Sequence, residues 1–94
     1  MALTKMFAKS DSTDFNQVLG NSVTGLLSNI IFTNESEDEA ILKLRSQDGM
    51  LYAIKKVPSK DTEVIKLEAI LDNERIIFES NQIDCYCSTQ LLQN

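Results

Sequence analysis

Apolar and polar residues alternate along several short segments of this chain, and turn-forming residues separate one segment from the next. The alternation is clearest between Gly49 and Ser88. A period of two places every second side chain on the same face of an extended strand, whereas a helix needs a period near 3.6. The pattern therefore predicts an all-β domain.

The first third of the chain contains three expected strands. We predict them over residues 2–7, 15–19 and 22–33, with a polar loop over residues 8–14 and a turn at Gly20-Asn21. The segment 22–33 does not alternate strictly, and it contains Gly25. We therefore expect this strand to carry a bulge near the glycine or to be buried on both faces.

A β-hairpin is predicted in the middle of the chain. Residues 40–45 place three apolar side chains on one face, and a second apolar segment follows over residues 50–57. Asp48-Gly49 lies between the two segments, and this pair favours a tight turn because it tolerates positive φ. Pro58 ends the second strand because it has no N–H to donate to a sheet.

Residues 62–71 fit two interpretations. Val64 and Leu71 fit one face of a helix, and the segment is rich in good helix formers. Ile65 and Ala69 instead fit one face of a strand. We favour the strand because the neighbouring segments are strands of similar length.

The C-terminal segments complete the expected fold. Asp72-Asn73 is predicted to close a hairpin, followed by a strand over residues 75–78 and a last strand over residues 83–89, which could continue to residue 92. About seven to eight short strands indicate a small antiparallel β-sandwich or jelly-roll-like domain, with a barrel as the nearest competitor. We expect residues 1–94 to form one domain in which residues 1–21 are an N-terminal arm. Polar residues at alternate positions would leave the outer faces hydrated. The expected core comprises Leu42, Leu44, Tyr52, Ile54, Ile65, Leu67, Ile76, Phe78 and Ile83.

The composition argues against enzymatic chemistry. The chain has no histidine, three glycines and one proline. It therefore lacks the usual means of building a nucleophile–base pair, a metal cage or a phosphate-binding loop. We expect no catalytic residues, no cofactor and no metal.

Charge and hydropathy argue against nucleic-acid and membrane partners. The formal charge of −5 repels a phosphate backbone. The chain has no apolar run near the ~18–20 residues that a membrane span requires, and its start is too short and too weakly charged for a secretory signal. We therefore expect synthesis in the cytoplasm, which makes the sequon Asn34-Glu35-Ser36 a chance match. The acidic residues 35–39 could bind a hard cation, but without a glycine-bearing calcium loop we favour a solvated turn.

Cys85 and Cys87 are expected to be buried free thiols. Residues two apart on a strand face the same side, which here would be the side of Ile83. Two thiols are too few for a zinc site, and a disulfide between them would strain an extended backbone. The alternative is an intermolecular or redox role.

The order of these segments resembles that of small structural proteins of tailed bacteriophages. The resemblance covers most of the chain from Ser22 onward. Two features depart from the usual pattern: Asp72-Asn73 replaces the common Asp-Gly turn, and no proline-glycine turn precedes Ser22. The matching segments are IIFTNES at 30–36, AILKL at 40–44, LYAIKKVP at 51–58, IKLE at 65–68, DNERIIF at 72–78 and IDCYCS at 83–88.

The resemblance implies a non-enzymatic virion protein, made in the host cytoplasm, that associates with itself and with other virion proteins. It would serve as a capsid decoration, neck or tail component, or as the base of a fibre. We expect the self-contact on apolar residues of the outer faces, at Ile41, Leu51 and Ile77. The alternative is a cytoplasmic module that binds a protein or peptide along a sheet edge.

Overall fold

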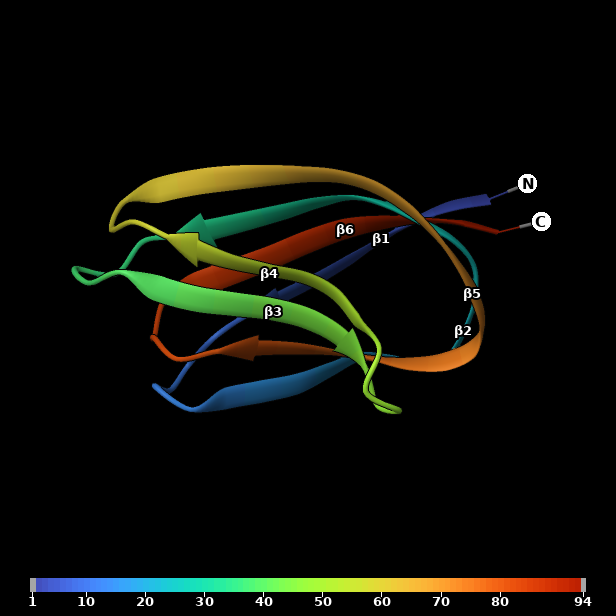
Figure 1. Ribbon diagram of the computed structural model, residues 1–94, viewed down its shortest axis with the longest axis horizontal. Helices are drawn as coiled ribbons and strands as arrows, with labels where there is room; N and C mark the ends of the chain where they lie inside the picture. Colours follow the sequence, from blue (N-terminus) through green and yellow to red (C-terminus); the bar gives the residue numbers. More distant parts are fainter. Residues whose placement is uncertain (1, 94) are drawn as a thin grey trace.

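The computed structural model describes residues 2–93, and every regular element in this range is a strand. The strands form one antiparallel sheet in the order β1-β6-β2-β5-β3-β4 (Figure 1). The all-β prediction is confirmed, but the chain has six strands instead of seven or eight. They are β1 (Ala2–Lys9), β2 (Phe15–Asn34), β3 (Ala40–Ser46), β4 (Leu51–Val57), β5 (Asp61–Ser80) and β6 (Cys85–Gln93).

Two long, bent strands explain the lower count. β2 and β5 have 20 residues each, and the sheet turns over where they bend (Figure 1). Phe15, at the start of β2, pairs with Ser80 at the end of β5, and Asn34 pairs with Asp61. The predicted strands over residues 15–19 and 22–33 are thus the two halves of β2. Residues 62–71 and 75–78 are likewise the two halves of β5.

Local backbone chemistry allows these bends. Gly25 has a φ of 147°, and a Cβ atom there would lie 2.5 Å from the carbonyl oxygen of Leu92. The register of β2 against β5 shifts between Val23 and Gly25, so the expected bulge is confirmed. Asn73 has a φ of 54°, and its N–H donates a hydrogen bond to Oγ1 of Thr24 at 3.0 Å. The predicted hairpin at Asp72-Asn73 is wrong, because this contact keeps the chain within β5.

The predicted turn at Gly20-Asn21 is wrong, because β2 continues through both residues. The local predictions for residues 40–71 are confirmed. β3 and β4 pair as a hairpin, and Gly49 adopts a φ of 98° in its turn. The N–H of Ser46 donates to the carbonyl oxygen of Met50 at 2.8 Å across this turn. Pro58 directly follows the end of β4. Residues 62–71 are extended, as the strand interpretation requires.

The sheet encloses its hydrophobic core on the concave side. Phe15 and Phe32 both pack against Phe78, with ring centroids 5.8 and 6.2 Å apart. These contacts join the first half of β2, its second half and the second half of β5. The core therefore holds the two arms of the bent strands together. Of the predicted core residues, Leu42, Leu44, Ile76 and Phe78 are fully buried, and Tyr52, Ile65 and Leu67 pack partly buried against the core.

Two predicted core residues are wrong. Ile54 is 51% exposed because it pairs with Lys43 on the convex side of the β3-β4 hairpin. Ile83 is 43% exposed and lies before β6, outside the alternation of that strand. The N-terminal segment, in contrast, is a full member of the sheet. β1 pairs with β6 from Ala2 to Lys9, and the residues from Phe15 to position 21 belong to β2.

Candidate functional site

The two cysteines are buried thiols of the hydrophobic core. Cys85 and Cys87 are free, fully buried and part of the hydrophobic core, which confirms their expected burial on one face of a strand. They do not share the side of Ile83, since that residue lies outside β6. Burial raises the pKa of the Cys85 thiol and raises the pKa of Cys87 to about 12. Both groups therefore stay protonated at neutral pH, and thiols are poor nucleophiles.

A buried asparagine organises the acidic loop. The side-chain amide of Asn34 donates to the carbonyl oxygens of Asp38 at 2.8 Å and Val57 at 2.9 Å. Its Oδ1 accepts from the backbone N–H of Ser36 at 2.9 Å. Asn34 is fully buried, so its side chain is unavailable for glycosylation. Glu37 points into solvent beside Lys60, as expected of a solvated turn, and residues 2–93 contain no cluster of three metal-ligating side chains.

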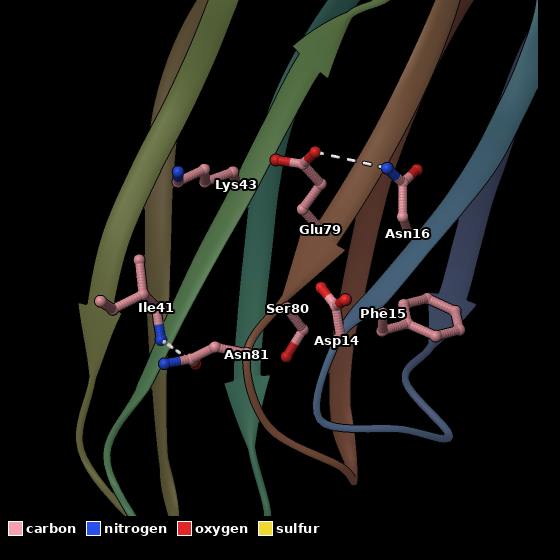
Figure 2. Close-up of a pocket in the computed structure, with 8 residues that line it drawn as sticks. All are labelled: Asp14, Phe15, Asn16, Ile41, Lys43, Glu79, Ser80 and Asn81. Atoms are coloured by element: carbon pink, nitrogen blue, oxygen red, sulfur yellow. Dashed lines mark hydrogen bonds between the residues drawn. The ribbon is translucent and has the colours of Figure 1, made fainter.

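A shallow polar hollow lies on the convex side of β2, β5 and β3. Its volume is about 260 Å³, and Figure 2 shows Asn16 and Glu79 pointing toward one another within it. The Asn16 amide donates to Oε1 of Glu79 at 3.4 Å, and the backbone N–H of Ile41 donates to Oδ1 of Asn81 at 2.7 Å. Ser80 lines the hollow, but its hydroxyl donates to the carbonyl oxygen of Gln82. This hydroxyl is therefore engaged with a backbone carbonyl group.

A different part of the convex surface carries the candidate site. It comprises the outward side chains of β1, β6, the second half of β2 and the first half of β5, and we call it the apolar face. Pairing across these strands aligns Leu3 with Leu92, Leu92 with Leu26, and Leu26 with Ile70. Leu3 is 64% exposed and Ile70 is 85% exposed. Four neighbouring strands thus present one continuous apolar row.

A second apolar row crosses the same four strands. Phe7 pairs with Ser88, Ser88 with Ile31, and Ile31 with Val64. The three apolar members are exposed, and the Phe7 ring packs beside Tyr86 with centroids 5.8 Å apart. Among the described residues, five of the nine exposed large hydrophobic side chains belong to the two rows: Leu3, Phe7, Ile31, Val64 and Ile70. The expectation of hydrated outer faces is therefore wrong for this part of the sheet.

A polar row separates the two apolar rows. Lys5 pairs with Gln90, Gln90 with Ser28, and Ser28 with Glu68. The amide of Asn29 donates to Oε1 of Gln90 at 3.1 Å. The row therefore has a positive charge at its β1 end, a negative charge at its β5 end and neutral hydrogen-bonding groups between them.

The sequence-predicted contact residues lie on the other half of the convex surface. This surface, which we call the charged face, comprises the outward side chains of β3, β4, the second half of β5 and the first half of β2. Leu51 pairs with Arg45, and Arg45 pairs with Ile77. Leu51 is exposed and Ile41 is half-buried, but Ile77 is only 7% exposed. Their role in self-association stays a prediction.

An ion pair explains why Ile77 is covered. Arg45 lies opposite Ile77, and its guanidinium donates to Oε1 of Glu79 from Nη2 at 2.8 Å and from Nε at 3.0 Å. Glu79 lies two residues beyond Ile77 on the same face of β5. The arginine stem therefore runs beside the isoleucine toward Glu79, and Val18 pairs with the isoleucine on its other side. Long charged side chains commonly cover apolar surface in this way. Ile77 is buried without belonging to the core.

The sequence analysis missed the apolar face because no single segment contains it. Its members come from four strands, and the register between strands decides which side chains meet. A partial signal exists within single strands, since Leu3 and Phe7 share the outward phase of β1 and Val64 and Ile70 share that of β5. Several apolar residues in the outward phase of one strand are thus a partial signal of an apolar surface, which the cross-strand register has to complete.

Comparison with known proteins leaves the function to be argued from this surface. No known protein family matches the chain, and no characterised protein is similar enough to count as a relative. Residues 2–93 contain no helix that is long and apolar enough to cross a membrane.

Proposed function

We propose that the protein is a non-enzymatic structural subunit that works by association through its apolar face. In this proposal the folded-over sheet is a small β-sandwich-type building block, and the jelly roll is its nearest architectural relative. The single observation that carries the proposal is the pair of exposed apolar rows across β1, β6, β2 and β5.

The exposure of these rows is costly for an isolated molecule. Exposed single hydrophobic residues are normal, but a contiguous apolar patch on a soluble protein usually marks a contact surface. Ile31 illustrates the point, because it lies in β2 with neighbours on both sides and is still 37% exposed. Only a group stacked on the face could remove it from water.

The sequence resemblance supplies the biological setting of the proposal. It implies a subunit of the virion of a tailed bacteriophage, in contact with copies of itself and with other virion proteins. A repeated subunit suits this setting because many weak, symmetric contacts add up to a stable assembly.

A peptide-binding module is the alternative function. The specific observation in its favour is that β1 and β4 are the outermost strands, so each has one unpaired backbone edge. An extended peptide could add to such an edge. However, β1 carries Lys5 and Lys9, and β4 carries Lys55 and Lys56. Lysines on edge strands discourage further pairing, which favours the face over the edges.

Sedimentation experiments test the proposal with two matched variants. Val64→Lys/Ile70→Lys changes the apolar face at residues that are 56% and 85% exposed. Leu51→Lys/Ile54→Lys adds the same charge to the charged face at residues that are 47% and 51% exposed. We expect wild type and the charged-face variant to associate between micromolar and millimolar concentration, and the apolar-face variant to remain monomeric with an unchanged circular dichroism spectrum.

Two results would count against the proposal. Loss of association in the Leu51→Lys/Ile54→Lys variant alone would assign the contact to the face predicted from the sequence. A wild-type protein that stays monomeric at millimolar concentration and does not bind phage particles lacking it would contradict the structural-subunit function. Binding of an extended peptide by that monomer would favour the alternative.

A further inference from the structure

We propose that the apolar face binds the same face of a second copy, around a two-fold axis that runs parallel to the strands between β6 and β2. This inference rests on the proposed function and specifies its partner and geometry. The axis lies in the interface plane, so β1 of one copy faces β5 of the other, and β6 faces β2. Each cross-strand row then meets the same row of the second copy.

The apolar rows are complementary in this arrangement. In the first row, Leu3 faces Ile70 of the second copy, and Leu92 faces Leu26. A shallow hollow of about 440 Å³ lies among Leu26, Ile70 and Leu92, where the outward side chain of Leu3 from the second copy can enter. In the second row, Phe7 faces Val64 of the second copy. Apolar groups thus meet along the whole first row and at both ends of the second row, where Ile31 of each copy faces Ser88 of the other.

Charge complementarity selects this axis. The central polar row has Lys5 at its β1 end and Glu68 at its β5 end. The axis brings Lys5 of each copy opposite Glu68 of the other, and the symmetry makes two such pairs. Lys66 occupies the outward position of β5 between Glu68 and Val64. This half of β5 pairs with β2 alone, so the long Lys66 side chain can turn toward water at the open edge of the strand. Opposite charges across an interface fix its register and suppress wrong pairings.

A two-fold axis across the strands gives a poor fit. It would place β1 over β1 and β5 over β5 of the second copy. With the axis on the central polar row, Lys5 would face Lys5 and Glu68 would face Glu68, so like charges would meet at both ends of the row. Only the strand-parallel axis pairs apolar rows with apolar rows and opposite charges with each other.

The size of the face agrees with a weak dimer. Four strands about 4.8 Å apart, each contributing about seven residues at ~3.3 Å per residue, cover roughly 19 Å by 23 Å. Both copies together would bury on the order of 1,000 Å², which is near the lower limit for a specific interface. We therefore expect a reversible dimer with an affinity in the micromolar range.

Charge reversal in separate chains tests the axis. Lys5→Glu puts a second carboxylate opposite Glu68 at both symmetric positions of its own dimer, and Glu68→Lys puts a second ammonium group opposite Lys5. We expect each variant alone to associate at least roughly 10-fold more weakly than wild type at low salt. A mixture of the two variants restores opposite charges at both positions, so we expect a one-to-one heterodimer with near wild-type affinity. High salt should reduce these differences because it screens the charges.

A charge reversal on the other face is the control. Lys56→Glu changes the net charge by the same amount as Lys5→Glu but lies on the charged face, where it is exposed and pairs with Ile41. We expect this variant to dimerise with wild-type affinity. Mixing it with Glu68→Lys should not produce a heterodimer of near wild-type affinity. A wild-type dimer whose charge variants show no recovery on mixing would overturn the axis and leave the proposed function intact. A wild-type monomer at every concentration would overturn both.

Discussion

The two halves of the convex surface both carry exposed apolar residues, and on the charged face these are Leu51 and Ile54, but the halves differ at Ile77. On the apolar face, Val64 and Ile70 are 56% and 85% exposed. On the charged face, Ile77 is 7% exposed and lies between Val18 and Arg45, whose guanidinium binds Glu79. An outward apolar residue is therefore not in itself a contact site. What matters is whether a neighbouring charged side chain of the same molecule covers it.

The single strand β5 takes part in both faces and shows how the difference arises. Its first half pairs only with β2, so Val64 and Ile70 have a strand on one side. Its second half lies between β2 and β3, where Glu79 pairs with Asn16 on one side and with Lys43 on the other. The bend at Asn73 thus divides one strand into an uncovered segment and a covered one.

The largest expected effect that tests this comparison is on folding stability. Ile77→Ala should lower the free energy of unfolding by about 2 kcal/mol or more, because it removes a covered side chain from a packed site. Ile70→Ala should change it by less than about 0.5 kcal/mol, because the side chain is already in water. Urea denaturation, at concentrations too low for association, measures both values.

The two isoleucines are well matched, since both lie on outward positions of β5 and both lose the same atoms. Equal losses of unfolding free energy in Ile77→Ala and Ile70→Ala would mean that Arg45 and Glu79 do not shield Ile77 from water. The two faces would then not differ in how their apolar residues are covered. A Val64→Ala variant provides a second exposed reference.

The sequence predicts local structure well, and the reasons for its failures are non-local. Asp48-Gly49 specifies its turn through its own backbone preferences, and the hairpin forms as expected. Asn73 has a similar tolerance for positive φ, which is compatible with either a hairpin or a bend. Its hydrogen bond to Thr24 selects the bend, and that partner lies 49 residues away in the chain. No pattern around Asn73 contains this information.

The same limit applies to the candidate site. Alternation correctly places Ile41, Leu51 and Ile77 outside the core, but it cannot show that Arg45 covers Ile77. The apolar face is harder still to predict, because its rows need the registers of three strand pairs. Cys87 is an easier case, since its position in the alternation of β6 is sufficient to predict its burial.

An independent effect, on the pH dependence of stability, tests whether β6 separates a dry interior from its wet outer side. Cys87 faces inward, and burial raises its pKa from 9.0 to about 12. Above about pH 9 the unfolded chain releases this proton while the folded chain retains it, so stability should fall as the pH rises toward 12. The slope should approach about 1.4 kcal/mol per pH unit for this one group.

The Cys87→Ala variant isolates that contribution. It should be less stable than wild type at about pH 8, and the difference between the two proteins should narrow as the pH rises. Unfolding by urea at several pH values provides the measurement. A constant difference between about pH 8 and pH 11 would show that water reaches Cys87 in the folded protein.

The smallest expected effect concerns the way Arg45 covers Ile77. It separates the contribution of the arginine's apolar stem to stability from the contribution of its charge. Arg45→Met keeps a long apolar stem opposite Ile77 but removes both hydrogen bonds to Glu79. Arg45→Ala removes the stem as well. Because ion pairs at a protein surface contribute little and apolar cover contributes more, we expect Arg45→Met to stay close to wild type and Arg45→Ala to be the less stable of the two. Thermal unfolding at low and high salt measures the stability of both variants. The small loss of stability in Arg45→Met should become smaller still at high salt. If the methionine variant loses as much as the alanine variant, the charge and not the stem protects Ile77, and the contrast between the two faces would then depend on ionic strength.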